Sequence, residues 1–295
     1  MVTATATRIT IITRRAAGLI TMKTIGTKAT ADALAASVTP ADGRLHDSSR
    51  SVATCVDART HAPDIGGSGP ACTPSELARL LTWLSPAFPV GSYSYSHGLE
   101  WVVETGGVRD VGTLTGWIED VLDHGAGRSD AIFLAAAWRA ASSGDGARLE
   151  DVAELAAAFA PSAERQLETL AQGTAFLTAV VAAWPKPALA ALAAHGRLAY
   201  PVAVGACAAA HDLPLAATAH AYVQAFAANI VSAAVRLVPL GQSDGLRALA
   251  RLEPAIARTV AVGTSGTLDD IGSATIAADI ASMRHETQYT RLFRS

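Results

Sequence analysis

The chain has 295 residues, of which 50% are hydrophobic and 17% charged, and it carries a formal net charge of −3. This composition supplies enough apolar side chains for a buried core and excludes a mainly disordered chain. The small negative charge gives no overall electrostatic reason to bind a phosphate backbone, because nucleic-acid-binding domains usually carry a basic face. We therefore expect a folded protein without a nucleic-acid partner.

The first 72 residues differ in composition from the rest. They are rich in Thr, Ala and Arg, and no acidic residue precedes Asp32. Organelle transit peptides share these traits, whereas Arg14 and Arg15 interrupt the apolar run that a secretory signal requires. A disordered extension, or a start codon chosen too far upstream, explains the same composition and is the interpretation we prefer. The glycine-rich stretch at 66–70 then marks the linker into a folded domain of residues 73–295.

From residue 73 onward the hydrophobic pattern is helical, and no alternating strand pattern is convincing. Four amphipathic helices are predicted where apolar residues recur at three- and four-residue spacing, and Pro185 and Pro187 stop the fourth. The fold class is therefore all-α, a single helical bundle with further helices at 202–210, 214–238 and 243–262. The four stripes consist of Leu77, Leu80, Leu81 and Leu84; Leu114, Trp117, Ile118, Val121 and Leu122; Leu149, Val152, Ala156 and Phe159; and Leu167, Leu170, Thr174, Leu177 and Val181.

The longest stretch without Asp, Glu, Lys or Arg runs from residue 213 to residue 235, which is long enough for a membrane helix. Its polar side chains and many alanines would make membrane insertion poor, so a helix enclosed in the bundle, with no contact to a membrane, is the better interpretation. Asn229 and Arg236 share one side of this helix, and His220 and Gln224 lie on the opposite side. We expect these groups to be hydrogen-bonded inside the protein or at an interface.

The sequence contains no complete motif for catalysis or for metal binding. No Gly-x-x-x-x-Gly-Lys loop is present to hold nucleotide phosphates, so any nucleotide chemistry belongs to a partner. The turn at 91–95 lacks the second glycine of a Gly-x-Ser-x-Gly elbow. His285 and Glu286 suggest a zinc helix, but Tyr289 stands where the second histidine is needed. The three scattered cysteines form no Cys-x-x-Cys pair, which favours a reducing cytoplasm.

The segment GSYSYSHG at 91–98, which follows Pro86 and Pro89, interrupts the helical pattern. A turn bounded in this way cannot bury every side chain in a helix interface, so Tyr93 is a candidate for contact with a partner. The simpler interpretation is that Ser96 caps the next helix. The two roles are compatible, and the sequence leaves both open.

The last 17 residues, DIASMRHETQYTRLFRS at 279–295, form a second candidate contact segment. They mix aromatic and aliphatic side chains with arginines, as binding hot spots do, and contain too few apolar residues to bury themselves. Such a segment needs a surface to order it. That surface is either the body of the same protein or that of a partner.

Three segments, 80–106, 232–245 and 279–295, together resemble the UreF-type urease accessory proteins. The resemblance covers the chain from about Thr73 onward, and the three segments occur in the family's order. It departs from the family in the N-terminal extension and at Thr174, where a basic residue is common. By this resemblance the candidate partner-binding residues are Tyr93, Ser94, His97, Glu100, Arg236, Gln242, Asp244, Arg284, His285, Glu286, Gln288, Tyr289, Arg291 and Phe293.

The resemblance also implies a role. Members of the family have an all-α fold, are often homodimers, and act as non-catalytic adaptors between the scaffold protein UreD (also UreH) and the GTPase UreG, so that nickel reaches apo-urease. Nickel and GTP would then be handled by the partners, with no metal and no cofactor bound directly. The tail would face the scaffold, with Tyr289 and Phe293 as anchors, and the surface around Tyr93 would communicate with the GTPase.

Two other classes of function remain open from the sequence. One is a helical enzyme that binds a metal or a small molecule through His97, Glu100 and His285. The other is a peripheral membrane protein led by the basic N-terminal residues.

Overall fold

The computed structural model describes residues 72–194 and 196–295, and every regular element within these ranges is a helix. The predicted all-α class is therefore confirmed. The predicted disorder of residues 1–72 falls outside the described residues, apart from Cys72, and the domain boundary at residue 73 stays a prediction. The α-helices are α1 (Pro74–Trp83), α2 (Leu99–Glu104), α3 (Val111–His124), α4 (Ala126–Ser143), α5 (Gly146–Ala158), α6 (Ala163–Ala183), α7 (Pro187–Ala194), α8 (Tyr200–Ala210), α9 (Leu215–Leu237), α10 (Gln242–Ser265) and α11 (Ile276–His285), with 3-10 helices at Ser92–Ser94 and Leu268–Asp270.

The helix ends follow local side-chain chemistry. Thr73 caps α1 by accepting the backbone N–H of Glu76 at 3.3 Å, while the Glu76 carboxylate accepts the N–H of Thr73 at 2.7 Å. Ser162 caps α6 in the same way by accepting a backbone N–H of its first turn. At its other end α6 stops at Ala183, just before Pro185, as the sequence predicts.

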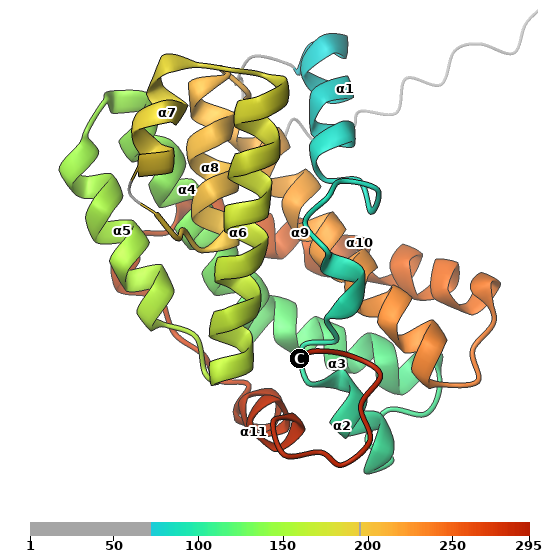
Figure 1. The fold of residues 1–295 in the computed structure, drawn as a ribbon. Coiled ribbons are helices and arrows are strands. Elements are labelled where there is room, and N and C mark those ends of the chain that lie inside the picture. The colour runs from blue at the N-terminus through green and yellow to red at the C-terminus, as the bar shows by residue number, and fades with distance from the viewer. Residues whose placement is uncertain (1–71, 195) are drawn as a thin grey trace, which may run out of the picture. The chain divides into compact units, whose positions relative to one another are not determined.

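Helix α4 lies at the centre of the bundle, where it packs against α3, α5, α8, α9 and α10 (Figure 1). Every residue from Ala131 to Ala137 is buried. Gly205 of α8 comes so close that a Cβ atom on it would lie 2.3 Å from the carbonyl oxygen of Leu134. The sequence pattern did not predict α4, because its middle turns, residues 131–137, contain no polar residue to set a helical period.

Helix α1 buries less of its apolar stripe than the sequence predicts. Leu80 and Trp83 are buried, whereas Leu77 and Leu81 are exposed. The packing of α1 is mainly against α9, and one neighbouring helix covers only a narrow stripe.

Helix α9 is the long apolar helix predicted from the sequence, and it packs against α2, α3, α4, α8 and α10. Within the described part of the chain, no helix is long and apolar enough to cross a bilayer. The expectation of satisfied polar groups holds on one side, since Asn229 donates to the carbonyl oxygen of Tyr95 at 3.3 Å. His220 on the other side is exposed.

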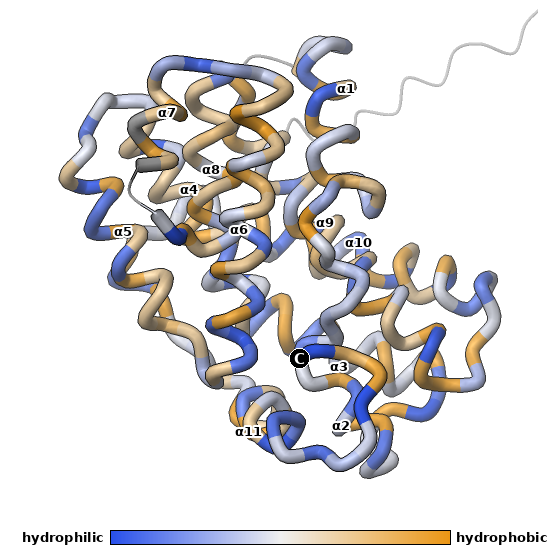
Figure 2. The backbone as a smooth tube through the Cα atoms, in the orientation of Figure 1, coloured by the Kyte–Doolittle hydropathy of each residue, from blue (hydrophilic) through white to orange (hydrophobic). Residues whose placement is uncertain are grey.

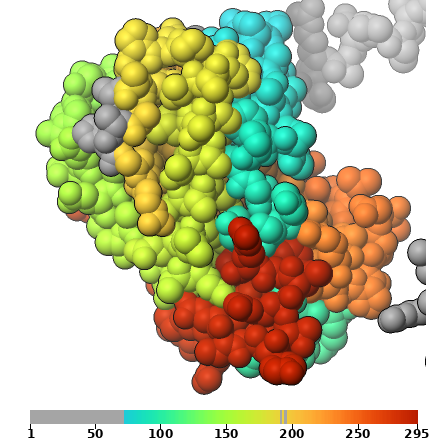
Figure 3. Space-filling model, in the orientation of Figure 1, coloured from blue at the N-terminus to red at the C-terminus, as the bar shows by residue number. Residues whose placement is uncertain are grey.

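The tail returns to the body of the domain after α11. Figure 1 shows it running from α11 past α2 and ending beside the chain that precedes α2. Figure 2 shows hydrophobic and hydrophilic positions interspersed along most helices, as amphipathic packing requires. In Figure 3 the residues of α11 and the tail cover one end of the visible face and touch both the α6 region and the α2 region.

Candidate functional site

The tail and the Tyr93 loop (residues 91–98) form one structural unit. The N–H of Arg294 donates to the carbonyl oxygen of Ser94 at 2.8 Å, and the N–H of Ser96 donates to the main-chain oxygen of Ser295 at 2.7 Å. The Ser96 hydroxyl donates to that same oxygen at 2.5 Å and accepts the N–H of Glu100 at 3.4 Å. Ser96 therefore accepts one N–H of the first turn of α2, as one interpretation of the sequence predicts, although Gly98 is the N-cap residue, and it also holds the tail.

Arg236, from the second segment of the family resemblance, joins this unit. Its guanidinium donates to the carbonyl oxygen of Tyr93 at 2.8 Å and lies 4.4 Å from the centre of the Phe293 ring. Partial burial lowers the pKa of Arg236 from its usual value, yet an arginine stays charged at neutral pH. The cation over the aromatic ring adds about 0.5–1 kcal/mol of attraction at such a site. Arg236 thus ties the Tyr93 loop to the tail.

The buried carboxylate of Glu100 holds the backbone of the tail. It accepts the N–H of Leu292 at 2.7 Å and the N–H of Phe293 at 2.9 Å, and it contacts Nε2 of His285 at 3.2 Å. Hydrogen bonds to an ionised acceptor are roughly twice as strong as neutral ones. Glu100 therefore fixes the tail by its main chain, while the side chain of Leu292 stays exposed.

His285 is fully buried between two carboxylates. Its Nδ1 lies 2.6 Å from Glu164 and its Nε2 lies 3.2 Å from Glu100. The two ring nitrogens thus bridge a carboxylate of α2 and a carboxylate of α6. Arg291 binds the other oxygen of Glu164 at 2.5 Å, which completes a chain of polar contacts from α2 to the tail.

The start of α6 and the backbone of α11 provide a further attachment. The Glu286 carboxylate accepts the N–H groups of Ala163 at 2.8 Å and Glu164 at 3.3 Å, where the positive end of the helix dipole favours a negative charge. Gly98 has φ +76°, and a Cβ atom on it would lie 2.7 Å from the backbone nitrogen of Ser282. Only glycine permits both this conformation and this close approach.

A second buried carboxylate, Glu168 of α6, holds the far end of the tail. Its contacts are Nε2 of His97 at 3.1 Å, the Ser295 hydroxyl at 2.5 Å, Gln172 at 3.1 Å and the guanidinium of Arg165. Burial opposes ionisation of Glu168, but the charge of Arg165 and the hydrogen bond from the Ser295 hydroxyl outweigh it and keep the pKa of this carboxyl below its usual value. An ionised Glu168 can therefore accept all of these bonds.

His97 occupies an unusual backbone conformation, with φ +58°. Burial, reinforced by the charge of Arg165, lowers the pKa of His97 to about 3, so its ring is neutral at physiological pH. The ring donates through Nε2 to Glu168 and packs edge-on against Phe226, with the ring centres 4.9 Å apart. Its Nδ1 has no hydrogen-bond partner among the described residues.

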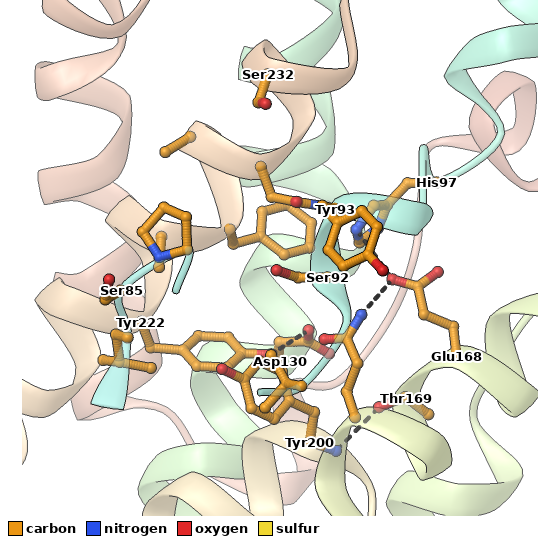
Figure 4. A pocket seen from close by; sticks show the side chains of 18 of the residues that line it. Ser85, Ser92, Tyr93, His97, Asp130, Glu168, Thr169, Tyr200, Tyr222 and Ser232 are labelled. Atoms are coloured by element: carbon orange, nitrogen blue, oxygen red, sulfur yellow. Dashed lines mark hydrogen bonds and ion pairs between the residues drawn. The ribbon is translucent and has the colours of Figure 1, made fainter. Parts of the chain in front are cut away.

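A cavity of roughly 130 Å³ lies beneath the Tyr93 loop. Figure 4 shows His97, Tyr93 and Glu168 on one side of it, and Asp130 beside Tyr222 on another. The Tyr222 hydroxyl donates to Asp130 at 2.8 Å, and burial raises the pKa of Asp130 to about 6 against the opposing effect of Arg165. The lining of the cavity is mainly apolar, and its charged side chains, Asp130, Arg165 and Glu168, all have hydrogen-bond partners within the protein.

The three residues of the alternative enzyme reading do not converge. Glu100 and His285 are in contact, but His97 binds Glu168 instead. Across residues 72–194 and 196–295, no group of three or more His, Cys, Asp or Glu side chains is placed to hold a metal ion.

The structure brings most of the candidate residues together but not all. Asp244 caps the start of α10 by accepting the N–H of Gly241 at 3.1 Å and pairs with Arg247, and Gln242 next to it is exposed. Tyr289 and Arg284 also face solvent. The candidate residues whose contacts hold the tail–loop unit together or attach it to the bundle are Tyr93, Ser94, His97, Glu100, Arg236, His285, Glu286, Gln288, Arg291 and Phe293.

Sequence reasoning missed Glu164, Arg165 and Glu168 on α6. Arg165 and Glu168 are buried; Glu164 and Glu168 connect the tail to the bundle, and Arg165 pairs with Glu168. Their one signal in the sequence is a set of charged residues at the start of a helix whose later turns are apolar, which is also the pattern of an ordinary exposed helix start.

Comparison with known proteins agrees with the three-segment resemblance. A family model described as UreF matches residues 108–253. The urease accessory protein UreF of Rhodopseudomonas palustris (strain HaA2) is 58% identical over 223 residues, which cover 75% of this chain and 94% of that protein. The protein of the same name from Bradyrhizobium diazoefficiens (strain USDA 110) is 54% identical over 238 residues, or 80% of this chain and 98% of the relative. The chain therefore belongs to the UreF family of urease accessory proteins, which are non-catalytic helpers rather than enzymes.

Proposed function

We propose that this protein is an adaptor in urease maturation, which joins a UreD/UreH-type scaffold to a UreG-type GTPase so that nickel is inserted into apo-urease. The observation that carries the proposal is the tail–loop unit, in which the inner side chains are locked to the bundle and the outer ones are free. Phe293 is buried under Arg236, whereas Tyr289 is fully exposed and Leu292 is 64% exposed. A rigid backbone that presents an aromatic and an aliphatic side chain loses little entropy on binding.

Tyr289 is then the main anchor for the scaffold, and Phe293 positions the segment from inside. The exposed Tyr93, whose carbonyl oxygen is held by Arg236, presents the neighbouring surface to the GTPase. Because Arg236 touches both Tyr93 and Phe293, a partner on the tail and a partner on the loop act on the same set of contacts. This coupling is what an adaptor between two proteins requires.

Nickel and GTP are bound by the partners in this proposal, and the chain contributes no cofactor. Two free thiols, Cys72 and Cys207, suit a reducing cytoplasm. We also propose that the adaptor works as a homodimer, as the family resemblance implies. The assembly experiment below tests these parts of the proposal as well.

The test is size-exclusion chromatography with light scattering on the full chain mixed with its cognate UreD-type and UreG-type proteins. The wild type should form a ternary complex whose mass gives the number of copies of each protein. Tyr289→Ala should weaken scaffold binding by about 2 kcal/mol, or roughly thirtyfold, as loss of a hot-spot aromatic does. Arg291→Ala should also weaken scaffold binding, but indirectly, because it removes the ion pair with Glu164 that holds the tail in place.

A matched control is Leu246→Ala, which removes an exposed apolar side chain on α10. It should leave complex formation unchanged. Failure of the wild type to bind either protein, at normal helicity, would overturn the adaptor role. Equal scaffold binding by the wild type and Tyr289→Ala would show that the tail has no part in the adaptor role.

A further inference from the structure

The outer face of α11 carries three large apolar side chains on successive turns. Ile276, Ile280 and Met283 are 68%, 48% and 49% exposed. Their spacing of four and three residues places them on one face of the helix, while Ser282 and His285 on the other face are buried. A row of exposed apolar residues of this kind marks a contact surface for another protein.

A groove of about 460 Å³ lies between α3 and the start of α11. Trp117 and Val121 line it from α3, and Ile276 lines it from α11. The N–H of Ala274 donates to the carbonyl oxygen of His124 at 2.8 Å, which ties the chain before α11 to the end of α3. The groove is therefore part of the folded structure, and its tryptophan is the residue type most enriched in binding hot spots.

The groove has one carboxylate, that of Asp120, and no Lys or Arg among its lining residues. Helix α3 contains Glu119, Asp120 and Asp123 and no Lys or Arg. Arg258 neutralises Asp123 at 2.7 Å, whereas the exposed Asp120 lines the groove and forms no ion pair with any residue that the structure describes. An unpaired carboxylate beside an apolar groove favours an occupant with a basic side chain next to aliphatic ones.

We propose that the α3–α11 face, formed by Trp117, Asp120, Ile276, Ile280 and Met283, binds an amphipathic segment of the UreD-type scaffold that carries aliphatic side chains and at least one Lys or Arg. The inference rests on the proposed function and gives the chemistry of that partner's contact. Helix α11 leads directly into the tail that presents Tyr289. The scaffold therefore contacts the C-terminal segment at two places, the groove and the tail.

The experiment is biolayer interferometry between the full chain and the cognate scaffold, with four lysine variants. Ile280→Lys and Asp120→Lys should each weaken binding at least tenfold, because each sets a positive charge against the basic segment. Leu155→Lys and Glu154→Lys are the matched controls on α5, where Leu155 is 41% exposed and Glu154 is also exposed. They should bind as the wild type does. All four sites are exposed, so circular dichroism and the melting temperature should be unchanged.

Asp120→Asn tests the proposed ion pair between Asp120 and the basic side chain of the scaffold. It should reduce the salt dependence of scaffold binding, because one screened ion pair is lost. A salt dependence equal to that of the wild type contradicts the basic side chain in the occupant.

The outcomes separate this inference from the adaptor role. If the wild type binds the scaffold and Ile280→Lys and Asp120→Lys bind it within twofold of the wild type, the α3–α11 face is not the scaffold site, although the adaptor role stands. The same holds if these variants lose self-association or GTPase binding instead, which assigns the face to a second copy or to the GTPase. If the wild type does not bind the scaffold, both proposals fall together.

Discussion

The α4 core and the tail–loop unit are held together by different forces. Around α4, alanine and glycine residues let helices approach until backbone atoms nearly touch, as at Gly205 and Leu134. At the tail, carboxylates such as Glu100 and Glu168 accept hydrogen bonds from the chain they hold. Apolar packing is non-directional and is lost only on unfolding, whereas a few charged hydrogen bonds can open locally. We therefore expect the core to set the stability of the fold and the tail–loop unit to control partner binding.

The largest expected effect is in the core. Phe176 is fully buried and lies edge-on to Trp83, with ring centres 5.6 Å apart. Phe176→Ala should lower the free energy of unfolding by about 3–5 kcal/mol, since a large cavity forms. Urea denaturation followed by circular dichroism measures this change. A loss below about 1 kcal/mol would contradict a closely packed core, and Tyr93→Ala, at an exposed aromatic, serves as the control.

A smaller and more local effect is expected at the tail. Glu100→Gln removes the charge that binds the N–H groups of Leu292 and Phe293 and faces His285. Charged hydrogen bonds contribute about 1.5–3 kcal/mol, so the tail should open more often while the core stays closed. Hydrogen exchange followed by mass spectrometry should show faster exchange at 286–295 and unchanged exchange in α4.

The control for this change is Glu154→Gln on α5, which replaces an exposed carboxylate and should alter neither segment. If Glu100→Gln speeds exchange in α4 as much as in the tail, the two regions unfold together and the comparison fails.

A third effect, which is spread over several pH units, concerns the pH dependence of stability. The pKa of His97 is about 3 in the folded protein and near 6.5 in the unfolded chain, so between these values the unfolded chain binds the extra proton. Stability should therefore fall as the pH drops from 6.5 towards 3, by at most about 1.4 kcal/mol per pH unit from this residue. His97→Gln should make the slope shallower. Asp130, with its pKa raised to about 6, contributes the opposite slope, which lowers stability as the pH rises from about 4 to 6.

Unfolding free energies of the wild type, His97→Gln and Asp130→Asn between pH 4 and pH 7 test both signs. Asp130→Asn should steepen the rise of stability with pH, because it removes the opposing contribution. Identical slopes in all three proteins would show that neither group titrates differently in the folded and unfolded states.

Amphipathic helices were the most predictable part of the fold. The apolar stripes and prolines predicted α1, α3, α5, α6, α8, α9 and α10 to within a few residues. Helix α4 was not predicted, because its buried alanines carry no polar–apolar period, and neither were α7 and α11. The exposure of Leu77 and Leu81 could not be predicted either, because a stripe shows which face is apolar and not how much of it a neighbour covers.

The sequence predicted the segments that form the candidate site, but not which of their side chains are buried and which are exposed. The composition of the tail and of the Tyr93 loop indicated contact segments, and the structure joins them through Ser94, Ser96 and Arg236. Phe293 and Tyr289 are both aromatic and four residues apart, yet the first is buried and the second is exposed. Their difference depends on Glu100, which is close to the tail only in three dimensions.

Local chemistry in the sequence determined that this protein is a helical bundle with two unusual polar segments, because helix periods, caps and prolines act over a few neighbouring residues. The tertiary structure decided that those segments meet, that His285 lies between Glu100 and Glu164, and that Ile276 stays uncovered beside α3. The reason is that buried charges are stable only where partners from distant parts of the chain converge on them, and no local pattern records which distant residues those are.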